Sequence, residues 1–229
     1  MKLVLFDIDG TILSAPGAGR RALSRALEQI YGTAGAVNGY DFRGRTDRSI
    51  VLELMCGAGL APDAVHAAME ACFDAYALAL AEEIGDGARV RVLPGVADLV
   101  GRLAATPSVT LGLLTGNTDQ GARIKLLPTG LWPRFRTGAY GSDHADRREL
   151  PGLAARRAQA LTGYAYRPRD VLVLGDTPLD IECARAFGAI AVAVATGQHS
   201  RDELAGERPD FLFDSFADVD AAMAALLRD

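Results

Sequence analysis

The sequence predicts an α/β protein in which a doubly wound parallel sheet carries an inserted helical cap domain. Two observations predict the sheet: short, almost wholly apolar runs recur along the chain, and helical patterns separate them. Runs of this kind are typical of parallel strands that helices cover on both faces. A third observation predicts the insertion, because residues 15–91 hold helical patterns but no convincing strand.

The predicted strands are the five apolar runs at residues 3–6, 109–114, 171–174, 190–194 and 211–213. Because these runs are apolar throughout rather than alternating, we expect them to be buried on both faces of one sheet. Helical patterns lie among them at residues 150–161, 178–187 and 216–227. The helix at 178–187 has the clearest boundaries, since Pro178 occupies a first helical position and Gly188 follows the last one.

Residues 15–91, here called the helical insert, predict a cap domain spliced into a core domain made of residues 1–14 and 92–229. Three apolar stripes at helical spacing indicate its helices: Leu23, Ala26, Leu27 and Ile30; Ile50 and Leu54; and Val65, Met69, Cys72, Phe73, Tyr76 and Leu80. Thr46-Asp47 and Pro62-Asp63 mark the starts of the second and third helices. We expect hinges near residues 14–18 and 89–94.

Composition excludes several classes of protein. The chain has 229 residues, of which 49% are hydrophobic and 23% charged, as in ordinary globular proteins. A net charge of -5 disfavours a nucleic-acid partner, and no apolar run reaches the roughly 18 residues of a membrane span. The start of the chain has no secretory pattern, and Cys56, Cys72 and Cys183 form no metal-binding pair. We therefore expect a cytoplasmic protein whose cysteines are buried; its oligomeric state is not predicted.

Polar residues of the kinds used in phosphate chemistry follow three of the predicted strands. The first strand leads into Asp7-Ile8-Asp9-Gly10-Thr11, the second into Thr115-Gly116-Asn117, and the third into Gly175-Asp176-Thr177, with Asp180 in the next helical turn. Ligands of open α/β sheets bind at the carboxyl ends of the strands, so these side chains are expected around one small volume.

Four carboxylates in one small volume repel one another, and a hard divalent cation offers the simplest compensation. Mg²⁺ prefers oxygen ligands and usually takes one or two carboxylates together with a substrate phosphate. We therefore predict a Mg²⁺ site among Asp7, Asp9, Asp176 and Asp180. Alternation along an extended chain sends the Asp7 and Asp9 side chains to opposite sides, so the two need not share one role.

These three segments, in this order and spacing, resemble three of the four signature motifs of the haloacid dehalogenase superfamily. The resemblance covers the whole chain, and the helical insert between the first two motifs resembles the C1 type of cap. It implies a phosphatase similar to the phosphoglycolate phosphatase group, acting on a small phosphorylated metabolite with Mg²⁺.

The resemblance also implies a role for each motif residue. Asp7 would be the nucleophile that forms an aspartyl-phosphate, and Asp9 the acid and base that serves the leaving group and then water. Mg²⁺ would be held by the Asp7 carboxylate, the Asp9 backbone carbonyl and Asp176, with Asp180 ordering a metal-bound water or the neighbouring ligands. The residues expected to grip phosphoryl oxygens are Thr115, Gly116 and Asn117.

The fourth motif departs from the family pattern, which usually supplies a lysine before the last acidic motif. This chain has arginines there, Arg147 and Arg148, and either guanidinium could neutralise the phosphoryl charge. The chain contains only two lysines, and Lys125, ten residues after Thr115, is an outside candidate for the same task.

In the helical insert, a polar loop precedes the helix predicted to begin near Thr46. Caps of this type often send such a loop into the site, so Arg45 and Thr46 are candidate substrate-binding residues, and Arg45 could meet an acidic substrate tail. A surface turn that only caps the helix is an equally good interpretation.

Two other functions stay open on the sequence alone. A sugar-phosphate mutase of the same superfamily shares this core, but it typically relies on a histidine and a lysine in the cap, which His66 alone does not supply. A phosphoacceptor signalling module or a non-catalytic binding module is the other alternative.

Overall fold

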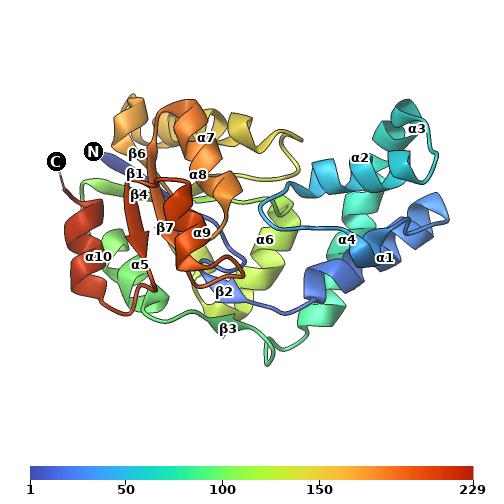
Figure 1. The fold of residues 1–229 in the computed structure, drawn as a ribbon, viewed down its shortest axis with the longest axis horizontal. Helices are drawn as coiled ribbons and strands as arrows, with labels where there is room; N and C mark the ends of the chain where they lie inside the picture. Colours follow the sequence, from blue (N-terminus) through green and yellow to red (C-terminus); the bar gives the residue numbers. More distant parts are fainter. Residues whose placement is uncertain (229) are drawn as a thin grey trace.

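Six parallel strands form the main sheet of the computed structural model, which describes residues 1–228 (Figure 1). In their order across the sheet, the strands are β5 (Thr137–Ala139), β4 (Val109–Leu114), β1 (Lys2–Phe6), β6 (Val171–Gly175), β7 (Ile190–Val194) and β8 (Phe211–Phe213). The predicted fold class is confirmed, and each of the five predicted strands is present. The three-residue β5 was not predicted, because so short a segment with a central glycine has no clear strand pattern.

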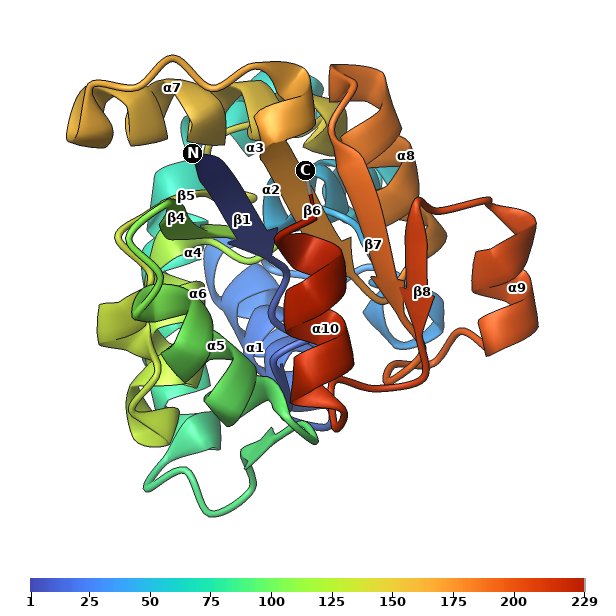
Figure 2. The ribbon, with the colours of Figure 1, turned by 90° about the vertical axis from the view of Figure 1, so that its left-hand side faces the viewer.

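Helices cover both faces of this sheet, as the apolar strands require. They are α5 (Val96–Ala104), α6 (Asp119–Leu126), α7 (Leu150–Thr162), α8 (Pro178–Phe187), α9 (Arg201–Gly206) and α10 (Val219–Leu226). Residues of α5, α6 and α10 pack on one face of the sheet, while those of α7, α8 and α9 pack on the other. Figure 2 shows α5 and α10 together over one face, with α7 at the top.

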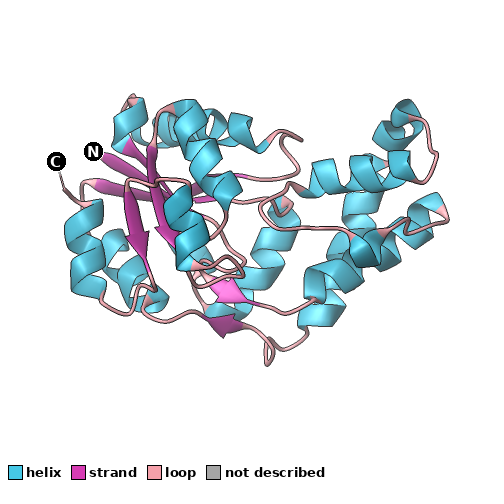
Figure 3. Ribbon diagram, viewed as in Figure 1, coloured by secondary structure: helices cyan, strands magenta, loops and turns pink. Residues whose placement is uncertain are grey.

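The helical insert contains four α-helices that lie to one side of the sheet (Figure 3). These are α1 (Ala18–Tyr31), α2 (Asp47–Gly57), α3 (Pro62–Ala67) and α4 (Met69–Ile84). The third predicted helix is therefore two helices, interrupted at Ala68, where neither glycine nor proline signals a break. A short antiparallel ribbon of β2 (Leu13–Ser14) and β3 (Arg91–Val92) joins the insert to the core near both predicted hinges.

The insert has a hydrophobic core of its own, separate from the two layers beside the sheet. Leu27, Met55 and Leu80 are fully buried in it, and each contributes about 1.5–3 kcal/mol by leaving water. This packing supports the proposed division into a core and a cap, although the boundaries at residues 14/15 and 91/92 stay a prediction.

The structure also tests the expectations about the cysteines and about membrane spans. Cys72 and Cys183 are buried as predicted, whereas Cys56 is exposed near the end of α2, so the prediction for Cys56 is wrong. Within residues 1–228, no helix combines the length and apolar character needed to cross a membrane.

Candidate active site

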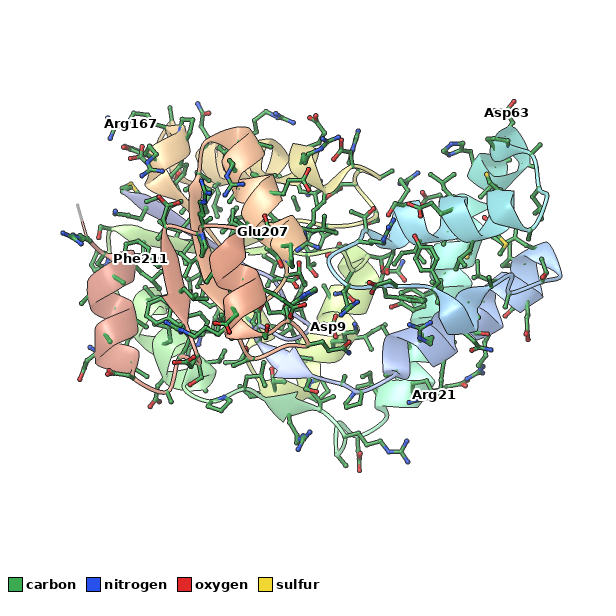
Figure 4. All side chains as sticks on the ribbon, viewed as in Figure 1. Asp9, Arg21, Asp63, Arg167, Glu207 and Phe211 are labelled. Carbon is green, nitrogen blue, oxygen red and sulfur yellow. The ribbon has the colours of Figure 1, made fainter. Side chains whose placement is uncertain are left out.

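The three motif-bearing strands are neighbours, so their carboxyl ends meet at one edge of the sheet. Strand β1 lies between β4 and β6, and Phe6 is in register with both Leu113 and Leu174. The residues that follow these strands face a cavity of about 420 Å³ between the core and the helical insert. Asp9, at the turn after β1, lines this cavity and lies between the sheet and the helical insert (Figure 4).

Three of the predicted metal ligands converge in this region. The carboxylates of Asp7, Asp176 and Asp180 are buried, and one oxygen of each lies within 4.8 Å of the others. Thr11 Oγ1 donates a hydrogen bond to Asp176 Oδ1 at 3.2 Å. Thr177 caps α8 and donates from Oγ1 to Asp180 Oδ2 at 2.7 Å, which fixes that carboxylate at the start of the helix.

Arg147 is the cation that the structure brings to these carboxylates. It lies in a turn before α7, and its Nη2 is 2.5 Å from Asp180 Oδ1 and 3.3 Å from Asp7 Oδ1. Burial alone would lower the pKa of this guanidinium, but the carboxylates of Asp180 and Asp7 raise it above the ordinary value. Arg147 therefore stays charged beside the expected nucleophile, and its buried Nε has no hydrogen-bond acceptor within residues 1–228.

Arg148, the alternative cation, does not reach the site. Its side chain is 56% exposed and forms an ion pair with Asp146 at 2.7 Å. The sequence left the two arginines unresolved because they are adjacent. The turn that contains them buries the first and directs the second to solvent.

The cluster suits a divalent cation in charge and in chemistry. With all three carboxylates ionised, Asp7, Asp176, Asp180 and Arg147 together carry two net negative charges. Burial raises the pKa of Asp7 to about 6 and, with the charges of Asp180 and Asp7, raises the pKa of Asp176 well above its usual range. A cation with oxygen ligands would favour the ionised forms, so these residues fit Mg²⁺.

The second motif, Thr115-Gly116-Asn117 after β4, lies beside the carboxylates. Gly116 and Asn117 line the cavity, as expected of phosphate-binding residues. Thr115 is fully buried, and its Oγ1 accepts a hydrogen bond from Asn117 Nδ2 at 2.8 Å. Thr115 is thus placed to orient Asn117, and it does not itself line the cavity.

Asp9 stands apart from the three-carboxylate cluster and pairs with Lys125, the outside candidate of the sequence analysis. The Lys125 ammonium on α6 lies 2.6 Å from Asp9 Oδ2 and 2.6 Å from Asn117 Oδ1. The site therefore holds two buried cations, Arg147 at the nucleophile and Lys125 at Asp9. The sequence showed only that Lys125 lies on the helix after Thr115, because the side-chain contact depends on how α6 packs.

The loop before α2 reaches the site, but its residues differ in position. Arg45 lines the cavity while pairing with Glu53 at 2.7 Å, so an acidic substrate would compete with that carboxylate. Thr46 is buried away from the cavity, where its hydroxyl caps α2 and donates to Ala145 O at 2.7 Å. Thr46 is thus not placed to bind substrate.

Asp47 is a site residue that the sequence analysis assigned only to the start of a helix. It lines the cavity, its backbone amide donates to Gly116 O at 2.7 Å, and its Oδ2 accepts from the Thr118 amide at 2.9 Å. Burial raises its pKa to about 6, which the charge of Lys125 partly opposes. Acidic residues are common in the first turn of a helix, where the helix dipole favours them. The sequence therefore did not distinguish Asp47 from an ordinary residue at a helix start.

Comparison with known proteins agrees with the motifs. A family model described as haloacid dehalogenase-like hydrolase matches residues 4–185, and a related hydrolase model matches residues 153–219. A phosphoglycolate phosphatase of Synechococcus elongatus is 30% identical over 232 residues, with both chains fully covered. A phosphoglycolate phosphatase of Rhodospirillum rubrum is 30% identical over 238 residues, which cover 95% of this chain and 89% of its own.

The solved structures agree on the fold. A hydrolase from Pseudomonas syringae superposes with a TM-score of 0.71 at 20% identity, covering 97% of this chain and 98% of its own. The family match spans the motif after β1, the motif after β4 and the acidic motif after β6, which are the segments that build the site. The chain is therefore an enzyme that belongs to the haloacid dehalogenase-like hydrolase family.

Proposed function

We propose that this enzyme is a Mg²⁺-dependent phosphatase that hydrolyses small phosphomonoesters through an aspartyl-phosphate on Asp7. The observation that carries the proposal is the position of Asp7, which is buried beside Arg147 and within the cluster of three carboxylates. A carboxylate becomes an effective nucleophile toward phosphorus when nearby positive charge offsets the repulsion between the two anions.

In the first step, an Asp7 carboxylate oxygen attacks phosphorus, and the bond from phosphorus to the leaving-group oxygen breaks. Arg147 opposes the negative charge that gathers on the phosphoryl group, since its Nη2 already lies 3.3 Å from Asp7. Asp9 gives its proton to the departing oxygen, so the product leaves as a neutral alcohol.

In the second step, water attacks the phosphorus of the aspartyl-phosphate and Asp9 takes the proton from that water. The bond between Asp7 and phosphorus breaks, which releases inorganic phosphate and regenerates the Asp7 carboxylate. Gly116 and Asn117, which line the cavity, hold phosphoryl oxygens through both steps.

Mg²⁺, held by Asp7 and Asp176 with Asp180 close by, would supply charge stabilisation to the phosphoryl oxygens when bound. The two net negative charges of the cluster support this ion. The chain's own part is to hold the ligands in place, which it does through Thr11 at Asp176 and Thr177 at Asp180.

The substrate is proposed to be a small phosphorylated metabolite. A cavity of about 420 Å³ has room for the phosphoryl group and a short remainder. Two relatives that match almost the whole chain are phosphoglycolate phosphatases, which makes phosphoglycolate the first compound to test.

The composition of the cavity disfavours the mutase alternative. No histidine is found among the described residues that line it, and the helical insert, which lines it with residues such as Gly19, Arg45 and Tyr76, contains no lysine. The histidine and lysine pair on which a mutase of this superfamily relies is therefore not present at the site.

Release of inorganic phosphate from a panel of phosphomonoesters, with and without Mg²⁺, tests the proposed function. We expect turnover of at least one small ester in Mg²⁺ and none in EDTA. A single equivalent of stable phosphoprotein without turnover would instead support the signalling alternative, and conversion of a sugar phosphate to its isomer would support a mutase.

A further inference from the structure

Lys125 is buried in an unusual position for a lysine. It lies on α6, lines the cavity and is only 4% exposed, although lysine is almost never fully buried unless it is paired. Its ammonium contacts Asp9 Oδ2 and Asn117 Oδ1, each at 2.6 Å. Neither atom belongs to the cluster of Asp7, Asp176 and Asp180, so this cation has a task separate from that of Arg147.

The contacts of Lys125 hold one oxygen of Asp9 and leave the other free. Asp9 Oδ2 accepts hydrogen bonds from Lys125 Nζ and from Asn117 Nδ2, the latter at 2.9 Å. Since Lys125 also donates to Asn117, the three side chains form a closed ring. No donor in the described part of the chain reaches Asp9 Oδ1, and the Asp9 side chain is 43% exposed toward the cavity it lines.

The helical insert supplies a second carboxylate near this lysine. Asp47 is buried, and its Oδ2 accepts from the amide of Thr118, the residue that caps α6. The positive charge of Lys125 lowers the pKa of Asp47, against the larger effect of burial. Lys125 therefore pairs with a carboxylate of the core and also acts through its charge on one of the insert, and Thr118, which caps its helix, is hydrogen-bonded to the insert.

We propose that Lys125 is a positioning residue for Asp9, which turns Oδ1 of that carboxyl toward the leaving-group oxygen while Asp47 docks α6 against the helical insert. This inference rests on the proposed function, in which Asp9 gives its proton to the leaving oxygen as the bond to phosphorus breaks, and it assigns that proton to Oδ1. Lys125 neither gains nor loses a proton in that step; it fixes where the proton is held.

Comparing two leaving groups distinguishes the positioning of Asp9 by Lys125 from a purely structural role of that lysine. A p-nitrophenyl leaving group departs readily as an anion, whereas an alkoxide needs a proton from the enzyme. Lys125→Met should therefore lower kcat for an alkyl phosphomonoester by about 10²-fold, the lower end of what a general acid contributes, and by less than about 10-fold for p-nitrophenyl phosphate. Lys125→Arg should recover part of the loss.

Matched variants make the comparison decisive. Arg123→Met removes an exposed cation from the same helix and should leave both rates unchanged. Asp9→Asn removes the acid itself, so its losses of kcat with the two esters show the pattern that Lys125→Met should follow in weaker form. If Asp9→Asn slows both esters equally, the acid role of Asp9 in the proposed function is wrong.

If Asp9→Asn discriminates between the two esters but Lys125→Met slows both equally, or slows neither, the positioning role of Lys125 is overturned. Should Lys125→Met fail to fold, Asn117→Ala carries the same comparison, because it removes the other donor to Asp9 Oδ2. A greater loss of kcat with the alkyl ester in that variant supports the positioning of Asp9 by Lys125 and Asn117, and an equal loss with both esters contradicts it.

Discussion

Nη2 of Arg147 lies 3.3 Å from Oδ1 of Asp7 and 2.5 Å from Oδ1 of Asp180. One buried guanidinium thus joins the expected nucleophile to the acidic motif after β6. Since a guanidinium is planar and has several donors, it can hold both carboxylates at once, which a lysine in the same place would do less well. This contact explains how the chain supplies positive charge at Asp7 with no lysine in its fourth motif.

Arg147→Ala should lower kcat by about 10²–10³-fold, because it removes a charged donor from the place where phosphoryl charge gathers. Arg148→Ala is the matched control, since its side chain is exposed and paired with Asp146. We expect its kcat to stay within about twofold of the wild type. Steady-state kinetics of the two purified variants check this prediction, and a larger loss in Arg148→Ala than in Arg147→Ala would contradict it.

Asp176→Ala should abolish the Mg²⁺ response of the protein as well as its activity. The side chain offers one of the three carboxylate oxygens that lie within 4.8 Å of one another. A ligand that binds only the native state raises the melting temperature, so Mg²⁺ should stabilise the wild type but not this variant. Thermal unfolding in EDTA and in millimolar Mg²⁺ provides a readout independent of turnover. Equal stabilisation of both proteins would place the metal elsewhere.

Asp47→Asn should stabilise the folded protein in a manner that depends on pH. Burial raises the pKa of Asp47 from 3.8 to about 6 in the folded state. The folded state therefore binds more protons than the unfolded state between these values, and the free energy of unfolding falls as pH rises through that window, by roughly 3 kcal/mol. The asparagine variant keeps an acceptor for the Thr118 amide but has no such dependence.

Urea unfolding of the wild type and Asp47→Asn near pH 4 and near pH 7.5 measures this effect. We expect similar stabilities at the lower pH and a more stable variant at the higher pH. An unchanged difference between the two proteins would mean that Lys125 offsets the cost of burying the Asp47 charge, and a wild type that gains stability over the variant as pH rises would mean that Lys125 more than offsets it; either result contradicts the prediction.

The sequence predicted most of what is governed by local patterns. The helix Pro178–Phe187 was predicted at both ends, because Pro178 and Gly188 give unambiguous start and stop signals. The meeting of Asp7, Thr115 and Asp176 at one edge followed from parallel topology alone. The prediction failed where packing decides, because nothing in the sequence marks the break at Ala68 or the presence of the short strand β5.

The same limit applies to the site. Arg147 and Arg148 are neighbours of identical type, and only the turn before α7 buries one and exposes the other. Lys125 and Asp47 come from different parts of the chain and meet near Asp9 only because the helical insert is docked on the Gly116 loop. Contacts of that kind depend on tertiary structure, so residue type and spacing made Lys125 a candidate but gave no sign that Asp47 belongs to the site.

Chemical trapping of the covalent intermediate tests the central claim most directly. The enzyme is mixed with a phosphomonoester and Mg²⁺, quenched during turnover, and reduced with borohydride, which converts an aspartyl-phosphate to homoserine. Peptide mass spectrometry should then find homoserine at residue 7 in the wild type, and none in Asp7→Asn, which should also have lost turnover. Unmodified Asp7 in an enzyme that is turning over, or homoserine at another aspartate such as Asp9 or Asp176, would contradict the account.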